Sequence, residues 1–148
     1  MIKQPFRHQN TSKGNKFQEF NEAEAYWQLR INDLPSCLAM TRLPARPGLS
    51  FNLCLTDPIS EYLADDQPWQ GIGGDYTIHF GEQSEAMPGH KKTLPVLHAT
   101  VGGFSRLWLG SVRANALTVT GEIHGEQGLL DKLEQSLSLP LPKAGWEF

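Results

Sequence analysis

The chain has 148 residues, of which 39% are apolar and 20% are charged, and this is enough for one globular domain with its own core. Its net charge of −3 at pH 7 argues against a protein that binds nucleic acid or an anionic membrane, because such proteins concentrate basic residues on one surface. No apolar run is long enough for a signal peptide or a membrane span. Since its two cysteines also fit a reducing compartment, we expect a soluble, cytoplasmic protein.

The N-terminal segment differs from the rest in charge. Residues 1–16 contain lysine and arginine but no acidic residue, and a polar, basic segment of this kind is typical of a mobile tail. Residues 17–25 carry apolar side chains at helical spacing, which predicts a short helix. We therefore treat residues 1–26 as an extension, partly disordered or helical, and place the domain at residues 27–148.

The sequence of the first half of the domain predicts two strands with a helix between them. Residues 27–31 alternate as a strand does. Asp33 then fits a helix N-cap, with Pro35 in the first turn, where proline is tolerated, and the helix should end before Pro44. Residues 49–56 are the clearest strand, because leucine and phenylalanine alternate there with polar side chains.

The second half predicts two more strands and then helices. The strands cover residues 75–80 and 94–101, and residues 81–92 between them form a connection with a turn at Pro88-Gly89. The helices cover residues 104–110, 113–120 and 129–137. Because strands and helices are mixed without a regular βαβ order, the fold class should be α+β.

Motifs for cofactor chemistry are missing or incomplete. The glycines at residues 71–74 precede a strand, whereas a phosphate-binding loop opens a helix. The same stretch, Q-G-I-G-G-D, fails the Q/R-x-x-G-x-G/A pattern of an acetyl-coenzyme A loop in its last position and its context. Ser105 lacks the second small residue of a nucleophile elbow. We therefore expect no cofactor.

The five histidines include no pair at metal-binding spacing such as H-x-x-x-H, so no metal site is predicted. His79 and His98 both fall in predicted strands and could meet across a sheet. That keeps open a small, self-sufficient enzyme built on this pair, although ordinary polar strand residues are the better interpretation.

Several short blocks, taken in order, resemble a known family. The blocks are W-Q-L-R-I-N-D-L-P, L-S-F-N-L-C-L-T-D-P, G-D-Y-T-I, L-W-L-G-S-V-R-A-N-A-L-T-V-T-G-E-I and the final W-E-F. Together they resemble the C-terminal, sterol-carrier-protein-like domain of Eis-type (enhanced intracellular survival) GNAT acetyltransferases. The resemblance runs from about Trp27 to Phe148.

The resemblance implies a fold and a place in an enzyme. The fold is a sheet of about five mostly antiparallel strands with helices packed on one face. In the family, this domain assists oligomer assembly, and the terminal carboxylate, here that of Phe148, reaches the active site as a general base. The acetyltransferase domains of the family are absent from these 148 residues, so we do not expect the chain to catalyse acetyl transfer alone.

The main hypothesis is a non-catalytic, sterol-carrier-like module that binds an apolar or lipid-like ligand or acts as an assembly domain. Its ligand would occupy a tunnel between sheet and helices. The tunnel lining would be Phe51, Leu53, Leu55, Phe104, Leu107, Trp108 and Leu133. The same residues would otherwise simply fill the core.

The alternative hypothesis is an accessory chain of a GNAT N-acetyltransferase that works in trans with the Phe148 carboxylate as base. An uncovered apolar surface around Trp69, Tyr76 and Trp146 would favour it. The candidate partners are therefore an apolar small molecule or lipid, an acetyltransferase chain and a second copy of this chain.

Overall fold

The computed structural model describes residues 30–44, 46 and 48–139. The elements in chain order are α1 (Leu34–Ala39), β1 (Leu49–Thr56), the 3-10 helix η1 (Pro58–Tyr62), β2 (Gly74–Phe80), β3 (Glu85–Pro88), β4 (Val96–Thr100), α2 (Val101–Trp108), α3 (Ala114–Val119), β5 (Ile123–Gly125) and α4 (Gln127–Ser136). The predicted extension, its helix at 17–25 and Phe148 lie outside the described residues. None of the helices in the described ranges is long and apolar enough to cross a membrane.

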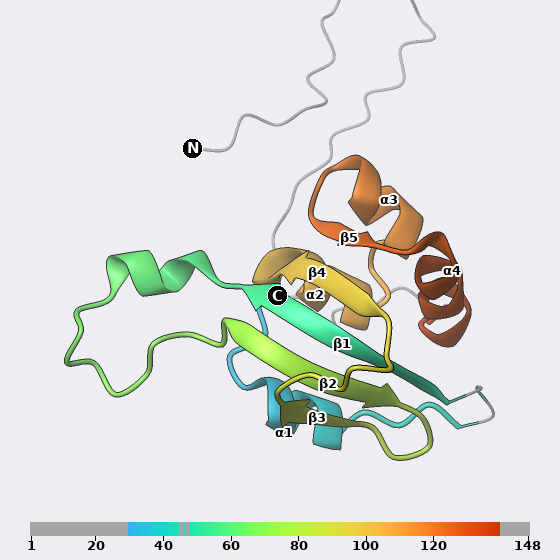
Figure 1. Ribbon diagram of the computed structural model, residues 1–148, viewed down its shortest axis with the longest axis horizontal. Coiled ribbons are helices and arrows are strands. Elements are labelled where there is room, and N and C mark those ends of the chain that lie inside the picture. Colours follow the sequence, from blue (N-terminus) through green and yellow to red (C-terminus); the bar gives the residue numbers. More distant parts are fainter. Residues whose placement is uncertain (1–29, 45, 47, 140–148) are drawn as a thin grey trace, which may run out of the picture.

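The strands form one mixed sheet in the order β3-β2-β1-β4-β5 (Figure 1). The central pair, β1 and β4, runs parallel, while the other neighbouring pairs run antiparallel. The prediction of an α+β fold with about five strands is therefore confirmed.

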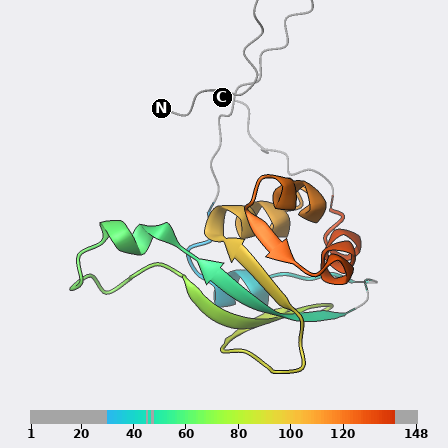
Figure 2. The ribbon, with the colours of Figure 1, turned by 45° about the horizontal axis from the view of Figure 1, so that its top comes forward.

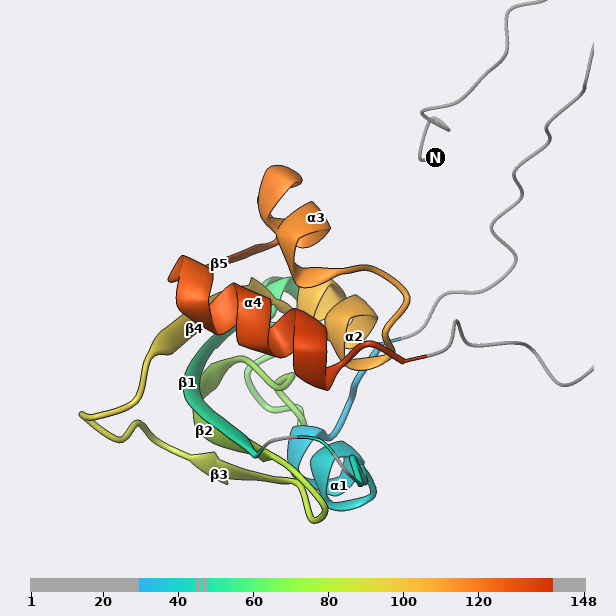
Figure 3. The ribbon, with the colours of Figure 1, turned by 90° about the vertical axis from the view of Figure 1, so that its right-hand side faces the viewer.

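One face of the sheet is apolar and packs against helices. Phe51 and Leu53 of β1 are fully buried, as are Ile78 of β2 and Leu97 of β4, which lie beside them in register. Figure 3 shows α1, α2 and α4 on this side of the sheet. The connection from β1 to β2, which contains η1, projects away from this body (Figure 2).

Two strands of the sheet differ from the sequence-based expectation. β3 lies within residues 81–92, for which the sequence predicts a connection. It is a four-residue edge strand that ends in Pro88. Proline has no N–H to donate to a neighbouring strand, so within sheets it occurs mainly in edge strands. β5 has three residues, too few for an alternating pattern to show.

The predicted strand at residues 27–31 is wrong for the two residues that the structure describes, since Arg30 and Ile31 lie outside the sheet. Ile31 is instead held by Ser105 of α2. The Ser105 hydroxyl accepts the Ile31 N–H at 3.0 Å and donates to the Val101 carbonyl at 2.7 Å. Because Ile31 and Ser105 are both buried, this bond provides the partner that a neighbouring strand would otherwise supply.

The Asp57 carboxylate joins three segments of the chain. It accepts the N–H of Ile59 at 3.1 Å, which caps η1, and the N–H of Ile72 at 2.8 Å, and it pairs with Arg30. Burial acts to raise the pKa of the Asp57 carboxyl, but the hydrogen bonds and the Arg30 charge together outweigh burial and lower it. Gly71 must be glycine here, because its φ is +90° and a Cβ would lie 2.6 Å from the carboxylate oxygen.

We predict that Asp57→Ala lowers the free energy of unfolding by about 3 kcal/mol, because it leaves a buried N–H and a guanidinium without their acceptor. Urea unfolding at pH 7 measures this loss. Asp33→Ala is the matched control, since Asp33 caps the exposed start of α1 in the same way and its loss should be clearly smaller. Equal losses in the two variants would contradict the role given to Asp57.

The stabilisation by Asp57 should also depend on pH. A carboxyl whose pKa is lower in the folded state stabilises fully above its unfolded pKa of about 4 and loses this contribution as pH falls through the lowered value. The difference in unfolding free energy between wild type and Asp57→Ala should therefore be constant near neutrality and shrink in acid. A difference that grows in acid would show that the ionised carboxylate is not the stabilising form.

Candidate functional site

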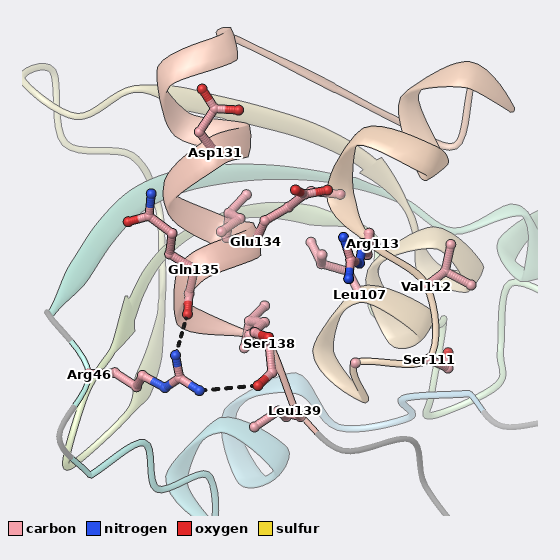
Figure 4. Close-up of a pocket in the computed structure, with 14 residues that line it drawn as sticks. Arg46, Leu107, Ser111, Val112, Arg113, Asp131, Glu134, Gln135, Ser138 and Leu139 are labelled. Atoms are coloured by element: carbon pink, nitrogen blue, oxygen red, sulfur yellow. Dashed lines mark hydrogen bonds between the residues drawn. The ribbon is translucent and has the colours of Figure 1, made fainter.

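A pocket of about 820 Å³ lies where α2, α3 and α4 meet (Figure 4). Leucines from α2 and α4 form part of its wall, and side chains of both charge signs surround it. The lining residues are Arg46, Leu107, Gly110, Ser111, Val112, Arg113, Ala114, Asp131, Leu133, Glu134, Gln135, Leu137, Ser138 and Leu139. This mixture suits a polar or charged molecule better than a hydrocarbon chain.

Arg46 borders the pocket at the C-terminal end of α4. Its guanidinium donates to the Gln135 carbonyl at 2.9 Å and to the Ser138 carbonyl at 3.1 Å (Figure 4). The last carbonyls of a helix have no partner within the helix and carry partial negative charge, so a cation stabilises them. Arg46 thereby holds the segment before β1 against the end of α4.

Glu134 holds α3 against α4. Its carboxylate accepts the backbone N–H of Asn115 at 3.0 Å. The N-cap residue of α3, Arg113, makes no side-chain capping bond, so Glu134 supplies the acceptor that a helix start needs. Asp131 lies one turn earlier on α4 and accepts a bond from Gln127 at 2.8 Å. Two carboxylates of α4 therefore line the pocket, one in a structural bond and one at an exposed position.

The residues of the predicted tunnel lie in the core or against it. The six buried ones are Phe51, Leu53, Leu55, Phe104, Leu107 and Leu133. Trp108 is partly buried and packs on them. Leu107 and Leu133 also line the pocket.

Trp108 has a structural partner. Its indole N–H donates to the Thr41 hydroxyl at 2.8 Å, and Thr41 donates in turn to the Cys37 carbonyl at 2.8 Å. This chain of bonds connects α2 to the end of α1. The polar atom of Trp108 is therefore engaged within the protein.

The structure does not bring His79 and His98 together. His79 lies opposite Ser50, whose hydroxyl is 2.9 Å from the His79 Nδ1. His98 lies beside Cys54, at a different position along β1. An enzyme built on this histidine pair therefore has no geometric support.

Instead, the structure gathers Cys54, Asp75 and His90 on the face of the sheet opposite the helices. Their sulfur, oxygen and nitrogen atoms all lie within 4.8 Å of one another. Burial, followed by the hydrogen bond and charge of Asp75, raises the pKa of the Cys54 thiol. No sequence spacing indicated this cluster, because its members come from β1, β2 and the connection between β3 and β4.

The proposed apolar surface is only partly described. Trp69 is 38% exposed, and the Arg30 guanidinium lies 5.6 Å from its ring centroid, within range of a cation–π interaction. Tyr76 is half-buried and donates its hydroxyl to the Ile72 carbonyl at 2.9 Å. Trp146 and Phe148 lie outside the described residues.

Comparison with known proteins finds similarity in structure alone. No protein-family model matches the chain, and no curated protein matches it. A GCN5-related N-acetyltransferase from Kribbella flavida matches with a TM-score of 0.60 and 19% identity over 76% of this chain and 26% of that one. A GCN5-related N-acetyltransferase from Anabaena variabilis matches with a TM-score of 0.59 and 18% identity over the same shares, 76% and 26%. The chain thus spans about a quarter of these enzymes and shares the fold of that part.

These matches correct the family inferred from the sequence. The two structures just described are GCN5-related N-acetyltransferases, so the identification as a sterol-carrier-protein-like domain of Eis-type enzymes is wrong. The hypothesis of a non-catalytic, lipid-binding module is wrong with it. The blocks that carry the resemblance contain residues that the local backbone geometry requires, such as Asp57, which caps η1, and Gly74, which has a φ of +146°. Capping residues and glycines with positive φ occur in many unrelated folds.

We predict that Trp108 and Thr41 are energetically coupled. In a double-mutant cycle of Trp108→Phe and Thr41→Val, the interaction energy should be about 1 kcal/mol, the net value of one hydrogen bond. Urea unfolding of the four proteins measures it. Additive losses would show that the bond between α2 and the end of α1 contributes nothing to stability.

Proposed function

We propose that this chain is one domain of a GCN5-related N-acetyltransferase and takes part in acetyl transfer from acetyl-coenzyme A to an amine. The observation that supports the proposal is the fold shared over 76% of the chain with two N-acetyltransferases. Since the chain spans 26% of each of them, we assign it a contributing role, with the rest of the reaction carried by another domain or chain.

The backbone hydrogen bonds of two candidate loops favour a binding site for acetyl-coenzyme A on that other domain or chain. A coenzyme A pyrophosphate binds where free N–H groups open a helix. In the glycine-rich stretch before β2, the Ile72 N–H is already taken by Asp57. At the start of α2, the Gly103 N–H is taken by the Thr100 hydroxyl at 3.0 Å. One N–H donor in each of these two segments is therefore already engaged within the protein.

The pocket suits the amine side of the reaction. An amine is protonated at neutral pH and must lose a proton before it attacks the thioester carbonyl and releases the coenzyme A thiolate. Asp131 offers an exposed carboxylate in the pocket that attracts such a cation. The Glu134 carboxylate is engaged by the Asn115 N–H, and Arg46 and Arg113 in the same lining repel a cation. The role of the Phe148 carboxylate as the base that removes the proton stays a prediction, because Phe148 lies outside the described residues.

A graft tests the proposal. The Kribbella flavida enzyme would receive this chain in place of the quarter that matches it, and acetyl transfer to an amine would be measured with acetyl-coenzyme A. The intact enzyme and the enzyme lacking that quarter are the controls. We expect the folded graft to transfer acetyl groups faster than the deletion. A graft that unfolds cooperatively, as the intact enzyme does, but is no more active than the deletion would overturn the proposal.

Within an active graft, Asp131→Asn should raise the KM for the amine by a factor of about 1.4 to 5 with little change in kcat, because an exposed carboxylate contributes about 0.2–1 kcal/mol to binding a cation. Asp65→Asn is the matched control, since Asp65 is an exposed acid in the connection between β1 and β2. Equal KM values for the two variants would show that the amine does not bind in this pocket.

A further inference from the structure

The atoms of the Cys54, Asp75 and His90 cluster have the spacing of metal ligands. The Cys54 sulfur lies 3.7 Å from the His90 Nε2, and that nitrogen lies 3.4 Å from an Asp75 oxygen. In tetrahedral zinc sites, bond lengths of about 2.3 Å to sulfur and about 2.0–2.1 Å to nitrogen or oxygen put sulfur and nitrogen about 3.6 Å apart and nitrogen and oxygen about 3.3 Å apart. These two distances match the separations between zinc ligands, and the Cys54 sulfur lies within 4.8 Å of the Asp75 oxygen.

The backbone positions two of the ligands. Cys54 and Asp75 are direct partners in the antiparallel register of β1 and β2. They lie on the same face, because residues paired across a sheet point to the same side. Since the neighbours of Cys54 along β1, Leu53 and Leu55, point into the core, the thiol points away from the helices. This separates the cluster from the pocket, which lies on the helical side.

The loop that carries His90 is fixed on both sides. The residue before it, Gly89, accepts a bond from the Thr77 hydroxyl at 2.8 Å. The residue after it, Lys91, exchanges two bonds with the buried Asn52 side chain, at 2.9 Å and 2.8 Å. His90 is thereby held over the sheet beside Cys54, with its Nε2 also 3.4 Å from the Leu53 carbonyl. A site anchored in this way loses little conformational entropy when it binds an ion.

We propose that Cys54, Asp75 and His90 form a binding site for Zn²⁺. A thiolate, an imidazole and a carboxylate are ligands that zinc accepts, whereas Mg²⁺ and Ca²⁺ prefer oxygen alone. On binding, the thiol gives up its proton to the solvent and the sulfur bonds the metal. With the Asp75 side chain 64% exposed, solvent can reach the cluster, so the fourth position takes water.

The test is a metal titration of the full chain. Co²⁺ is the spectroscopic probe, since a cobalt–thiolate bond gives a charge-transfer absorption, and Zn²⁺ is then added in competition. We expect one metal ion per chain and a thiolate band that zinc removes. Cys54→Ser should abolish the band, and His90→Ala should weaken zinc binding at least about 100-fold, the upper range for the loss of a mere supporting group.

Matched variants make the assignment specific. Cys37→Ser makes the same chemical change on α1, and His124→Ala removes another exposed histidine, on β5; both should bind like wild type. Thermal unfolding without metal should be similar in every variant, because each changed side chain is at least partly exposed. No thiolate band in wild type, or a Cys54→Ser variant that binds zinc as tightly as wild type, would overturn the proposal. Neither result would bear on the acetyltransferase graft, which measures acetyl transfer and not metal binding.

Discussion

The structure depends on one buried carboxylate, that of Asp57, at the point where β1 leaves the sheet. It accepts the N–H groups of Ile59 and Ile72 and pairs with Arg30, so it fixes both ends of the connection between β1 and β2 and the segment that precedes α1. Ser105 holds the neighbouring Ile31 against α2. Arg30 and Ile31, the first described residues, are thus attached to the sheet and the helices by polar bonds as well as by apolar packing, and polar bonds fix the direction in which a segment packs.

The central sheet separates two kinds of surface. On the helical side, the apolar row of β1 is covered by α1, α2 and α4, and the pocket opens where the last helices meet. On the other side, the polar row of β1 is partly covered by the loop that carries His90. A small-molecule site and a metal site can therefore exist on one domain without sharing a residue. The fold is shared with part of two known N-acetyltransferases.

Local sequence patterns predict much of the fold but few of the residues of the candidate sites. Asp33 as N-cap of α1 and the alternation of β1 were predictable, because each depends on a few neighbouring residues. The parallel pairing of β1 with β4, and the short strands β3 and β5, depend on contacts between distant segments. The same holds for the pocket and for the cluster around Cys54, whose members meet only after the sheet has formed. The family inferred from short blocks was wrong because capping residues and turn glycines reflect local geometry.

Hydrogen exchange at the Ile72 amide tests most directly whether Asp57 unites these segments. If the carboxylate is part of the cooperative core, this N–H should exchange only when the whole domain unfolds, as slowly as the amides of β1. Exchange of the Ile72 amide at the rate of the exposed residues 64–70, while the β1 amides stay protected, would show that the connection opens independently and would contradict the account.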